Sequence, residues 1–442
     1  MKQYLENLMD QTKKLLDSSE EFVSFSMNGE QTYFTRFNQA KVRQQGQVSQ
    51  YSLSICFALE GKNAQYEFFL TAQESLDLEK ISKFYKNFKA TYSEREKDSF
   101  YSVSTAGSEA SFVNESQSSS FESFKAPVQD ICSEVAGTDF VGIYAGGLFY
   151  RAFLNSNGQS CWHQIANHNL DYCLYYSKDK AIKNNYSDLK WNRDSFSKQI
   201  EFAKQGLKAL SKSEKKLQPG DYRVYLSPKA VSEVLGIMNW RCFSEESFQV
   251  KESPLFKMKE ESKNLSSLFN LSEDYSSGIN PLFTKGGHKV PELVKIIDSG
   301  RLVGSLTNSR AAKEFSLNMN AASGYLTSPV IGAGKLVEDD ILKRLDTGVY
   351  ISDLWYTNYS ELPTCRITGM TRFASFWVEK GEIIAPISVM RFDDSVYSFF
   401  GEQLEDLTQQ QQLISSAGSY RQRDLGAEKI PGALIKKFHF AL

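Results

Sequence analysis

The stretch LSPKAVSEVLGIMNW, residues 226–240, is the sequence feature that most constrains the fold of this chain. It follows the strand-like letters YRVY, and Ser227-Pro228 is a helix start signal because proline fits the first turn, where its missing N–H has no helical partner anyway. The residues with the spacing of one buried helical face are Val231, Val234, Leu235 and Met238. The sequence therefore predicts a strand that leads directly into a helix packed on a core. Neither histidine nor cysteine occurs in this stretch.

The first half of the chain alternates between strand and helix patterns. In VSQYSLSICFALEG the apolar residues fall at every second position, as in a half-buried strand, and one face would hold Tyr51, Leu53, Ile55, Phe57 and Leu59. SLDLEKISKFYKNFKATYSE has helical spacing instead, and NSNG at 155–158 is a turn signal between two strands. A further helix ends at QPGD, residues 218–221. We place the domain boundary there, with an α/β N-terminal domain at 1–219 and a C-terminal domain at 220–442.

The second half has more strand patterns than helices. RFASFWVEKGEIIAPI predicts a hairpin that turns at Lys380-Gly381, and KVPELVKIIDSGRLVGSL predicts strands around Ser299-Gly300. SRAAKEF predicts a short helix capped by Ser309. The expected fold class is thus α+β in two domains, with a mixed α/β N-terminal domain and a mostly β C-terminal domain.

Residues 93–124 differ from the rest of the N-terminal domain because they are rich in serine and show no sustained periodicity. Such a composition buries too little apolar surface to offset the entropy of ordering. We expect a mobile loop, either as a plain insertion or as a phosphorylated or partner-binding lid.

Charge and cysteine usage exclude several classes of function. The formal net charge of −2, with lysines dispersed among acids, gives no basis for binding nucleic acid or an anionic membrane. The N-terminus has no uninterrupted apolar stretch of a signal peptide, and later apolar runs are too short to span a bilayer. The six cysteines form no C-x-x-C pair, which favours reduced thiols. We expect a cytoplasmic protein.

No complete metal or nucleophile signature occurs in the sequence. His163 and His168 are an odd number of residues apart, so a strand would send them to opposite faces, whereas Cys161 and His163 would share one face. His163 has two possible roles: it is either a strand histidine whose ring nitrogens are hydrogen-bonded within the protein, or part of a zinc site. Cys365 is a possible nucleophile, although only Arg366 is nearby in sequence to lower its pKa.

The aromatic stretch from Tyr350 to Ile383 allows two interpretations. It could form a groove in which an extended peptide adds to a strand edge, lined by Trp355, Tyr356, Tyr359, Arg366 and Arg372. It could equally be a pair of core strands with aromatic packing.

The order of these elements resembles the TldD/TldE (PmbA) family. The segments that carry the resemblance are NSNG at 155–158, GDYRVYLSPKAVSEVLG at 220–236, SPLF at 253–256, IIDSGRLVGSLTNSRAAKEF at 296–315 and ITGMTRFASFWVEKGEIIAPI at 367–387. The resemblance covers nearly the whole chain except the serine-rich segment. It implies zinc peptidase complexes built from two related subunits, in which the TldD branch carries HExxxH on the helix after the VYL-like strand and a cysteine near the C-terminus.

This chain lacks those ligands in either register of the motif. The motif would fall at residues 236–241, or, with Glu233 as the acid, it would place Ser232 and Ile237 at the two histidine positions. No histidine lies between His168 and His288, and no cysteine follows Cys365. The pattern resembles the TldE branch, which implies no catalytic residue and no metal on this chain.

That branch implies a defined partner and substrate. Zinc would be held by a TldD-like catalytic partner in a heterodimer or larger complex, with a homodimer as the other arrangement, and the substrates would be small or unfolded peptides. The alternative is a stand-alone peptide-binding or scaffold protein without protease activity. A third hypothesis is an independent hydrolase that uses Cys365 or a metal at Cys161 and His163.

Overall fold

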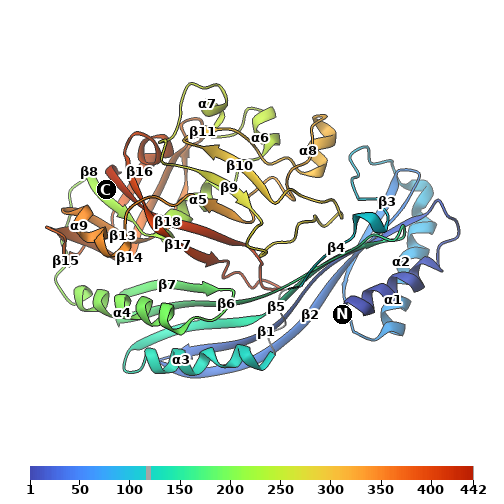
Figure 1. Cartoon of the computed structure of the whole chain (residues 1–442), viewed down its shortest axis with the longest axis horizontal. Helices are drawn as coiled ribbons and strands as arrows, with labels where there is room; N and C mark the ends of the chain where they lie inside the picture. The colour runs from blue at the N-terminus through green and yellow to red at the C-terminus, as the bar shows by residue number, and fades with distance from the viewer. Residues whose placement is uncertain (116–120, 442) are drawn as a thin grey trace.

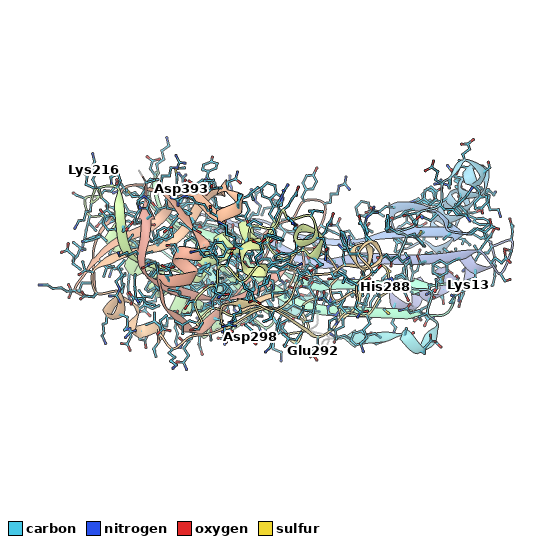
Figure 2. All side chains as sticks on the ribbon, turned by 90° about the horizontal axis from the view of Figure 1, so that it is seen from above. Lys13, Lys216, His288, Glu292, Asp298 and Asp393 are labelled. Carbon is cyan, nitrogen blue, oxygen red and sulfur yellow. The ribbon has the colours of Figure 1, made fainter. Side chains whose placement is uncertain are left out.

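The computed structural model describes residues 1–115 and 121–441, whose strands form two sheets. Figure 1 shows the first sheet as a layer of long strands that runs beneath the second sheet and continues beyond it to helices α1 and α2. Figure 2 shows the resulting elongated shape, with Lys13 toward one end, Lys216 and Asp393 toward the other, and His288 between them. The expected α+β class, with a mixed N-terminal part and a strand-rich C-terminal part, is confirmed.

The first sheet is seven-stranded in the described residues, with the order β3-β2-β1-β5-β6-β4, and β7 also pairs with β6. Its strands are β1 (Phe22–Asn38), β2 (Lys41–Leu59), β3 (Lys62–Phe69), β4 (Phe112–Glu115), β5 (Asp139–Asn155), β6 (Ser160–Ser177) and β7 (Lys180–Asp188). The pairings are antiparallel except for β4 with β6. Leu53, Ile55 and Phe57 of β2 are buried as predicted, but Ser52, Cys56 and Ala58 next to them are buried as well, so this part of the strand is not half-buried.

Four helices accompany the first sheet: α1 (Lys2–Lys13), α2 (Glu74–Thr91), α3 (Pro127–Glu134) and α4 (Arg193–Leu210). Helical spacing explains the packing of α2, since Ile81, Tyr85 and Phe88 are buried on one side of it. Asn192 is the N-cap of α4, and its side chain accepts a hydrogen bond from the Ser195 amide at 3.1 Å.

The second sheet is eleven-stranded in the described residues, and part of it closes on itself. Its strands are β8 (Gly220–Leu226), β9 (Leu271–Asp274), β10 (Leu293–Asp298), β11 (Arg301–Leu302), β12 (Pro329–Ile331), β13 (Gly348–Glu361), β14 (Arg366–Glu379), β15 (Glu382–Pro386), β16 (Arg391–Ser395), β17 (Leu404–Ser415) and β18 (Ala427–Phe440). The order β11-β10-β9-β12-β18-β16-β14-β13-β8 is joined by a further pairing of β18 with β8. Strands β18, β16, β14, β13 and β8 therefore form a ring.

Short helices fill the connections of the second half: α5 (Pro228–Asn239), α6 (Glu245–Gln249), α7 (Phe256–Lys259), α8 (Ser309–Glu314) and α9 (Ile341–Leu345). Helix α5 lies against β13 and β18. Single turns occur as 3₁₀ helices at η1 (Tyr92–Glu94), η2 (Ser108–Ala110), η3 (Phe121–Lys125), η4 (Glu338–Asp340) and η5 (Leu362–Thr364), and η6 (Ser398–Glu402) is a π-helical turn.

The predicted turns are confirmed, and one cap is corrected. Strands β5 and β6 meet at NSNG, β10 and β11 at Ser299-Gly300, and β14 and β15 at Lys380-Gly381. The φ of Lys380 is 52° and that of Gly381 is 78°, which suits the glycine of a tight turn. The N-cap of α8 is Asn308 rather than Ser309, because the Asn308 side chain accepts a hydrogen bond from the Ala311 amide at 2.9 Å.

The expectation of an irregular loop at 93–124 is wrong in part. Strand β4 lies within it and pairs in parallel with β6, from Phe112 opposite Cys161 to Glu115 opposite Gln164. The Ser104 amide donates to the Gly286 carbonyl at 2.7 Å, and a neighbouring contact joins the Ser102 hydroxyl to His288 at 3.2 Å. Long-range pairing of this kind leaves no local periodicity to detect. The part at 116–120 lies outside the described residues.

A connection that we call the strap, residues 416–426, leads from β17 to β18 across the first sheet. The backbone carbonyl of Arg421 accepts a hydrogen bond from Gln50 at 2.8 Å, and Gln422 donates to the Asn28 carbonyl at 3.3 Å. Leu425 is buried together with Phe149 of β5. The strap thus fixes the second sheet to the first.

In residues 1–115 and 121–441, none of the helices combines the length and the apolar character that a bilayer crossing requires.

Candidate functional site

Helix α5 forms where the sequence predicts it, and local chemistry fixes its start. The Ser227 hydroxyl accepts a hydrogen bond from the Ala230 amide at 3.2 Å and donates to the Ser352 carbonyl at 2.6 Å. The buried side of the helix faces the core of the second sheet and consists of Ala230, Val231, Val234, Leu235 and Met238. By helical periodicity the opposite side carries Lys229, Ser232, Glu233 and Gly236.

The residues at the positions implied for a zinc motif do not fit that metal. Ser232 donates its hydroxyl to Glu428, and Ile237 offers only hydrocarbon. In the other register Gly236 has no side chain, and Arg241 donates to Glu252 at 3.1 Å. Zinc takes thiolate, imidazole or carboxylate donors, usually four in a tetrahedron. Across the described parts of the chain, no group of three or more His, Cys, Asp or Glu residues is arranged to hold a metal ion.

Lys229 lies in the middle of the charges on this side of α5. Its Nζ is 2.5 Å from an oxygen of Glu233, one helical turn later, and it also interacts electrostatically with Asp353 of β13 and Glu428 of β18. Burial lowers the pKa of Lys229, but the three carboxylates outweigh that effect and the net shift is upward. The lysine therefore acts as a fixed cation among carboxylates. We call Lys229, Glu233, Asp353 and Glu428 the lysine-centred cluster.

Two carboxyl groups of this cluster, the buried Asp353 and the half-buried Glu428, lack full compensation of their charge. Asp353 is 1% exposed, and neither of its carboxyl oxygens has a hydrogen-bond partner. Burial raises the pKa of Asp353 to about 7, while Lys229 acts in the opposite direction. Burial likewise raises the pKa of Glu428 to about 7, against the hydrogen bond from Ser232. Such groups change protonation near neutral pH, which is typical of functional sites but also occurs in structural networks.

Three of the five residues proposed to hold a peptide come together on β13 and β14. Trp355 and Tyr356 pack with their ring centroids 5.6 Å apart, and the Arg372 guanidinium lies 5.7 Å from the Trp355 ring. Lys183 of β7 joins them from the first sheet, with its Nζ 5.6 Å from the same ring. Phe373 completes this group, which we call the aromatic–cation patch: Lys183, Trp355, Tyr356, Arg372 and Phe373.

The other two residues lie elsewhere. The Tyr359 hydroxyl contacts the Sγ of Cys242 at 3.1 Å, inside the second core. Arg366 forms an ion pair with Asp393, with its Nε 2.5 Å from the carboxylate. The pairing register separates them, because Tyr359 and Arg366 lie toward the β13–β14 connection and the patch lies further along both strands.

The remaining nucleophile and metal candidates are enclosed. The Cys365 side chain is fully buried, and burial raises the pKa of its thiol well above the ordinary value, which keeps it protonated. His163 contacts the Ile279 carbonyl at 3.1 Å and Asn114 at 3.4 Å. His168 contacts the Tyr144 hydroxyl at 2.8 Å. Burial lowers the pKa of each histidine to about 4.

Sequence reasoning missed the lysine-centred cluster and Lys183. The Lys229–Glu233 pair has the i,i+4 spacing of an intrahelical ion pair, and that signal could have identified it. Asp353 is the charged residue within the apolar strand VYISDLW, which is an anomaly for a buried strand. Lys183 reaches Trp355 only through the packing of one sheet on the other, so no local signal marks it.

Comparisons with known proteins give one match to a family model and several matches in fold. A family model described as PmbA/TldA metallopeptidase C-terminal domain matches residues 219–441. A search of curated proteins finds no match. The structure of TldE from Thermococcus kodakarensis aligns over 99% of this chain and 100% of its own, with 15% identity and a TM-score of 0.76.

Two further structures have been described as proposed modulators of DNA gyrase. The one from Thermotoga maritima aligns over 99% of this chain and 100% of its own, with 13% identity and a TM-score of 0.73. The one from Bacteroides thetaiotaomicron aligns over 99% of this chain and 98% of its own, with 16% identity and a TM-score of 0.73. At these identities the likeness shows a shared fold.

Proposed function

The chain belongs to the PmbA/TldD family of metallopeptidase-related proteins, and we propose that within it this chain is a non-catalytic, TldE-like subunit that holds peptide for a zinc-bearing, TldD-like partner. The partner's metal would activate the attacking water, and one such centre per complex is sufficient for hydrolysis. This chain would contribute the wall of the chamber and a surface on which substrate lies extended.

The observation that carries the proposal is the chemistry of α5. The face on which a zinc motif is expected presents a serine, a glycine and a lysine that is already paired with Glu233. A protonated lysine among carboxylates occupies the place of a cation, so a metal ion entering there would meet a like charge at close range. The helix keeps its packing face, while its opposite face carries Lys229 paired with Glu233.

The exposed end of β13 supports the peptide-holding role. Strand β8 pairs with β13 at Val349, Tyr350 and Ile351, and helix α5 also lies against β13. Tyr356 of β13 is exposed and offers a sequence-tolerant apolar contact for a peptide.

We further propose a cytoplasmic location. All six cysteines are free thiols, which agrees with a reducing compartment.

The test is recovery of the tagged full-length chain from native extract, with zinc counted per chain and peptide cleavage measured before and after separation. We expect a partner that carries HExxxH, zinc in the complex, and neither zinc nor cleavage in the isolated chain. Stoichiometric zinc together with peptide cleavage by the isolated chain would contradict the proposal. Recovery of a stable homodimer that does not bind an added TldD-like protein would favour the stand-alone scaffold.

A further inference from the structure

One face of helix α5 presents four residues in a row, and this row is open to solvent at its C-terminal end. At 100° per residue, the members lie within about 60° of one another around the helix axis: Lys229, Glu233, Gly236 and Trp240. Lys229 and Glu233 are half-buried, whereas Gly236 and Trp240 are exposed. We call this row the α5 stripe. It leads from the lysine-centred cluster to Trp240, the C-cap of the helix.

The cluster end of the stripe has more carboxyl groups than cations. The electrostatic interactions there join four carboxyl groups to two lysines: Asp171, Glu233, Asp353, Glu428, Lys183 and Lys229. Asp171 and Lys183 reach this place from β6 and β7 of the first sheet. Burial raises the pKa of Asp171, Asp353 and Glu428, because a buried carboxylate without a cation is costly. One further positive charge would lower that cost.

Several carboxyl oxygens at this end make no hydrogen bond. Glu233 accepts from Lys229 through one oxygen, and Glu428 accepts from Ser232 through one oxygen. Within residues 1–115 and 121–441 the second oxygen of each accepts none, and neither oxygen of the buried Asp353 has a partner. Buried polar groups normally have hydrogen-bond partners. The cluster therefore has unused capacity for a donor that carries a positive charge.

Gly236 leaves the backbone of α5 uncovered beside the cluster. A Cβ at this position would meet no atom within 4 Å, so packing within the chain does not require glycine there. Glycine inside a helix costs about 1 kcal/mol relative to alanine. Glycine is the usual residue where a ligand or another backbone approaches closely. The uncovered helix backbone is suited to a peptide that crosses α5 at this point.

An exposed aromatic surface lies at the other end of the stripe. Trp240 is 65% exposed and Tyr325 is 59% exposed. Asn239 holds the segment of Tyr325 against α5, because its side chain donates to the Leu326 carbonyl at 2.9 Å and accepts from the Leu326 amide at 2.6 Å. Along the helix axis Glu233 and Trp240 are about 10 Å apart, a length that about three residues of an extended peptide span.

We propose that the α5 stripe binds the free N-terminus of a peptide, with the ammonium group at Glu233 and Glu428, the next peptide bonds over Gly236, and an apolar side chain of the third or fourth residue on Trp240. This inference rests on the proposed peptide-holding function and adds the recognised group and the direction of the bound peptide. An ammonium group suits the cluster better than zinc does, because it carries a single charge and N–H donors that carboxylate oxygens accept. Lys229 shows that an ammonium group stays charged among these carboxyl groups, since its net pKa shift is upward.

The test compares two forms of one probe, a heptapeptide of alanine, valine and serine with fluorescein at its C-terminus and either a free or an acetylated N-terminus. Fluorescence anisotropy measures binding to the full-length chain, alone and in the complex recovered from native extract, which is treated with a chelator to stop cleavage. We expect acetylation to weaken binding about tenfold, since a charge-assisted contact is worth about one decade in affinity. Glu233→Gln should weaken binding of the free amine by a similar factor and leave the acetylated form unchanged.

Gly236→Leu separates peptide binding from stability. Its side chain would enter open space, and leucine forms helices better than glycine does. We therefore expect the unfolding free energy to stay equal or rise, while binding of the free-amine peptide falls about tenfold. Unchanged binding to this variant would overturn the placement of the peptide on α5.

Glu246→Gln is the matched control, because it neutralises an exposed glutamate on α6, and it should leave both forms unchanged. Equal binding of the free and acetylated forms would overturn the ammonium site while leaving peptide holding intact. An acetylated peptide with lysine as its first residue tests the other source of an ammonium group. If it bound as tightly as the free amine, the assignment to the N-terminus would be overturned. Absence of binding for all forms, alone and in the complex, would contradict the proposed function as well.

Discussion

The strap and helix α5 both bury charge, and they do so in opposite ways. At the strap, Arg423 donates to Asn167 at 2.5 Å and to the Thr32 hydroxyl at 3.3 Å, and its guanidinium lies 4.7 Å from the Phe149 ring. At α5, Asp353 is buried more completely than the half-buried Arg423, and it has no hydrogen-bond partner on either oxygen. A buried ion whose hydrogen bonds are all made stabilises one conformation. A buried ion without hydrogen bonds destabilises the fold, and protonation or ligand binding can remove that cost.

The contrast shows how one chain can combine a rigid joint between two sheets with a group of carboxyls that responds to pH. The strap joins the sheets through a cation that stays charged at every physiological pH, because burial lowers the pKa of Arg423 only to about 10. The lysine-centred cluster contains two carboxyl groups that titrate near 7. Substitutions at Arg423, Lys229 and Asp353 test whether this division holds.

The largest effect is expected for Arg423→Ala. This change leaves Asn167, Thr32 and the nearby Glu30 without their buried partner, and removing one member of a buried charged network costs about 3–5 kcal/mol of unfolding free energy. The loss should be the same at pH 7 and pH 8, since Arg423 is charged at both and the buried His168, whose pKa Arg423 helps to lower, is neutral at both. Guanidinium denaturation at the two pH values measures it.

Tyr420→Ala is the control for the strap, because Tyr420 is 91% exposed in the same segment. Its effect should stay within about 0.5 kcal/mol, as for other surface substitutions. If Arg423→Ala cost no more than this control, the strap would be a surface connection rather than a joint between the sheets.

Lys229→Met is expected to have a smaller effect that depends on pH. Loss of the central cation leaves Glu233, Asp353 and Glu428 to repel one another, and we expect a cost of about 2–4 kcal/mol at pH 8, below the full value for a buried pair because Lys229 is partly solvated. The cost should fall at pH 5.5, where protonation of Asp353 and Glu428 removes most of the repulsion. Urea denaturation at both pH values provides the measurement.

Lys208→Met, an exposed lysine near the end of α4, is the matched control and should have little effect at either pH. A Lys229→Met loss that is equal at pH 5.5 and pH 8 would show that the cluster is not charge-compensated by this lysine.

Local patterns predicted the elements in the neighbourhood of the site. The cap at Ser227, the apolar spacing of α5, the hairpin at Lys380-Gly381 and the opposite faces of His163 and His168 depend on residues close in sequence, and such signals survive in a single chain. The mostly β character of the second half followed from the same patterns.

Contacts between distant segments could not be predicted in this way. Strand β4 has no periodicity of its own and depends on its pairing with β6. The aromatic–cation patch joins Lys183 to Trp355 from two different sheets, and the pairing of Arg372 with Asp353 depends on the β13–β14 register. Burial of Asp353 has a similar origin, because a charged residue in an apolar strand can point either to solvent or to a neighbouring sheet.

Asp353→Asn is expected to cause the smallest change in unfolding free energy, and this change should be a stabilisation. The folded-state pKa of Asp353 is about 7, against an ordinary value of 3.8, so between these pH values the native state holds a proton that the unfolded state has lost. Stability of the wild type therefore falls as pH rises through this window, and asparagine removes that loss. Relative to wild type, the variant should gain about 1–3 kcal/mol between pH 5 and pH 8, which is below the ideal value of about 1.4 kcal/mol per unit because the site relaxes. Taking the difference at each pH cancels the titration of His163 and His168. A difference that stays flat from pH 5 to pH 8 would mean that Asp353 is compensated as fully as Arg423 is, and the contrast between the two regions would disappear.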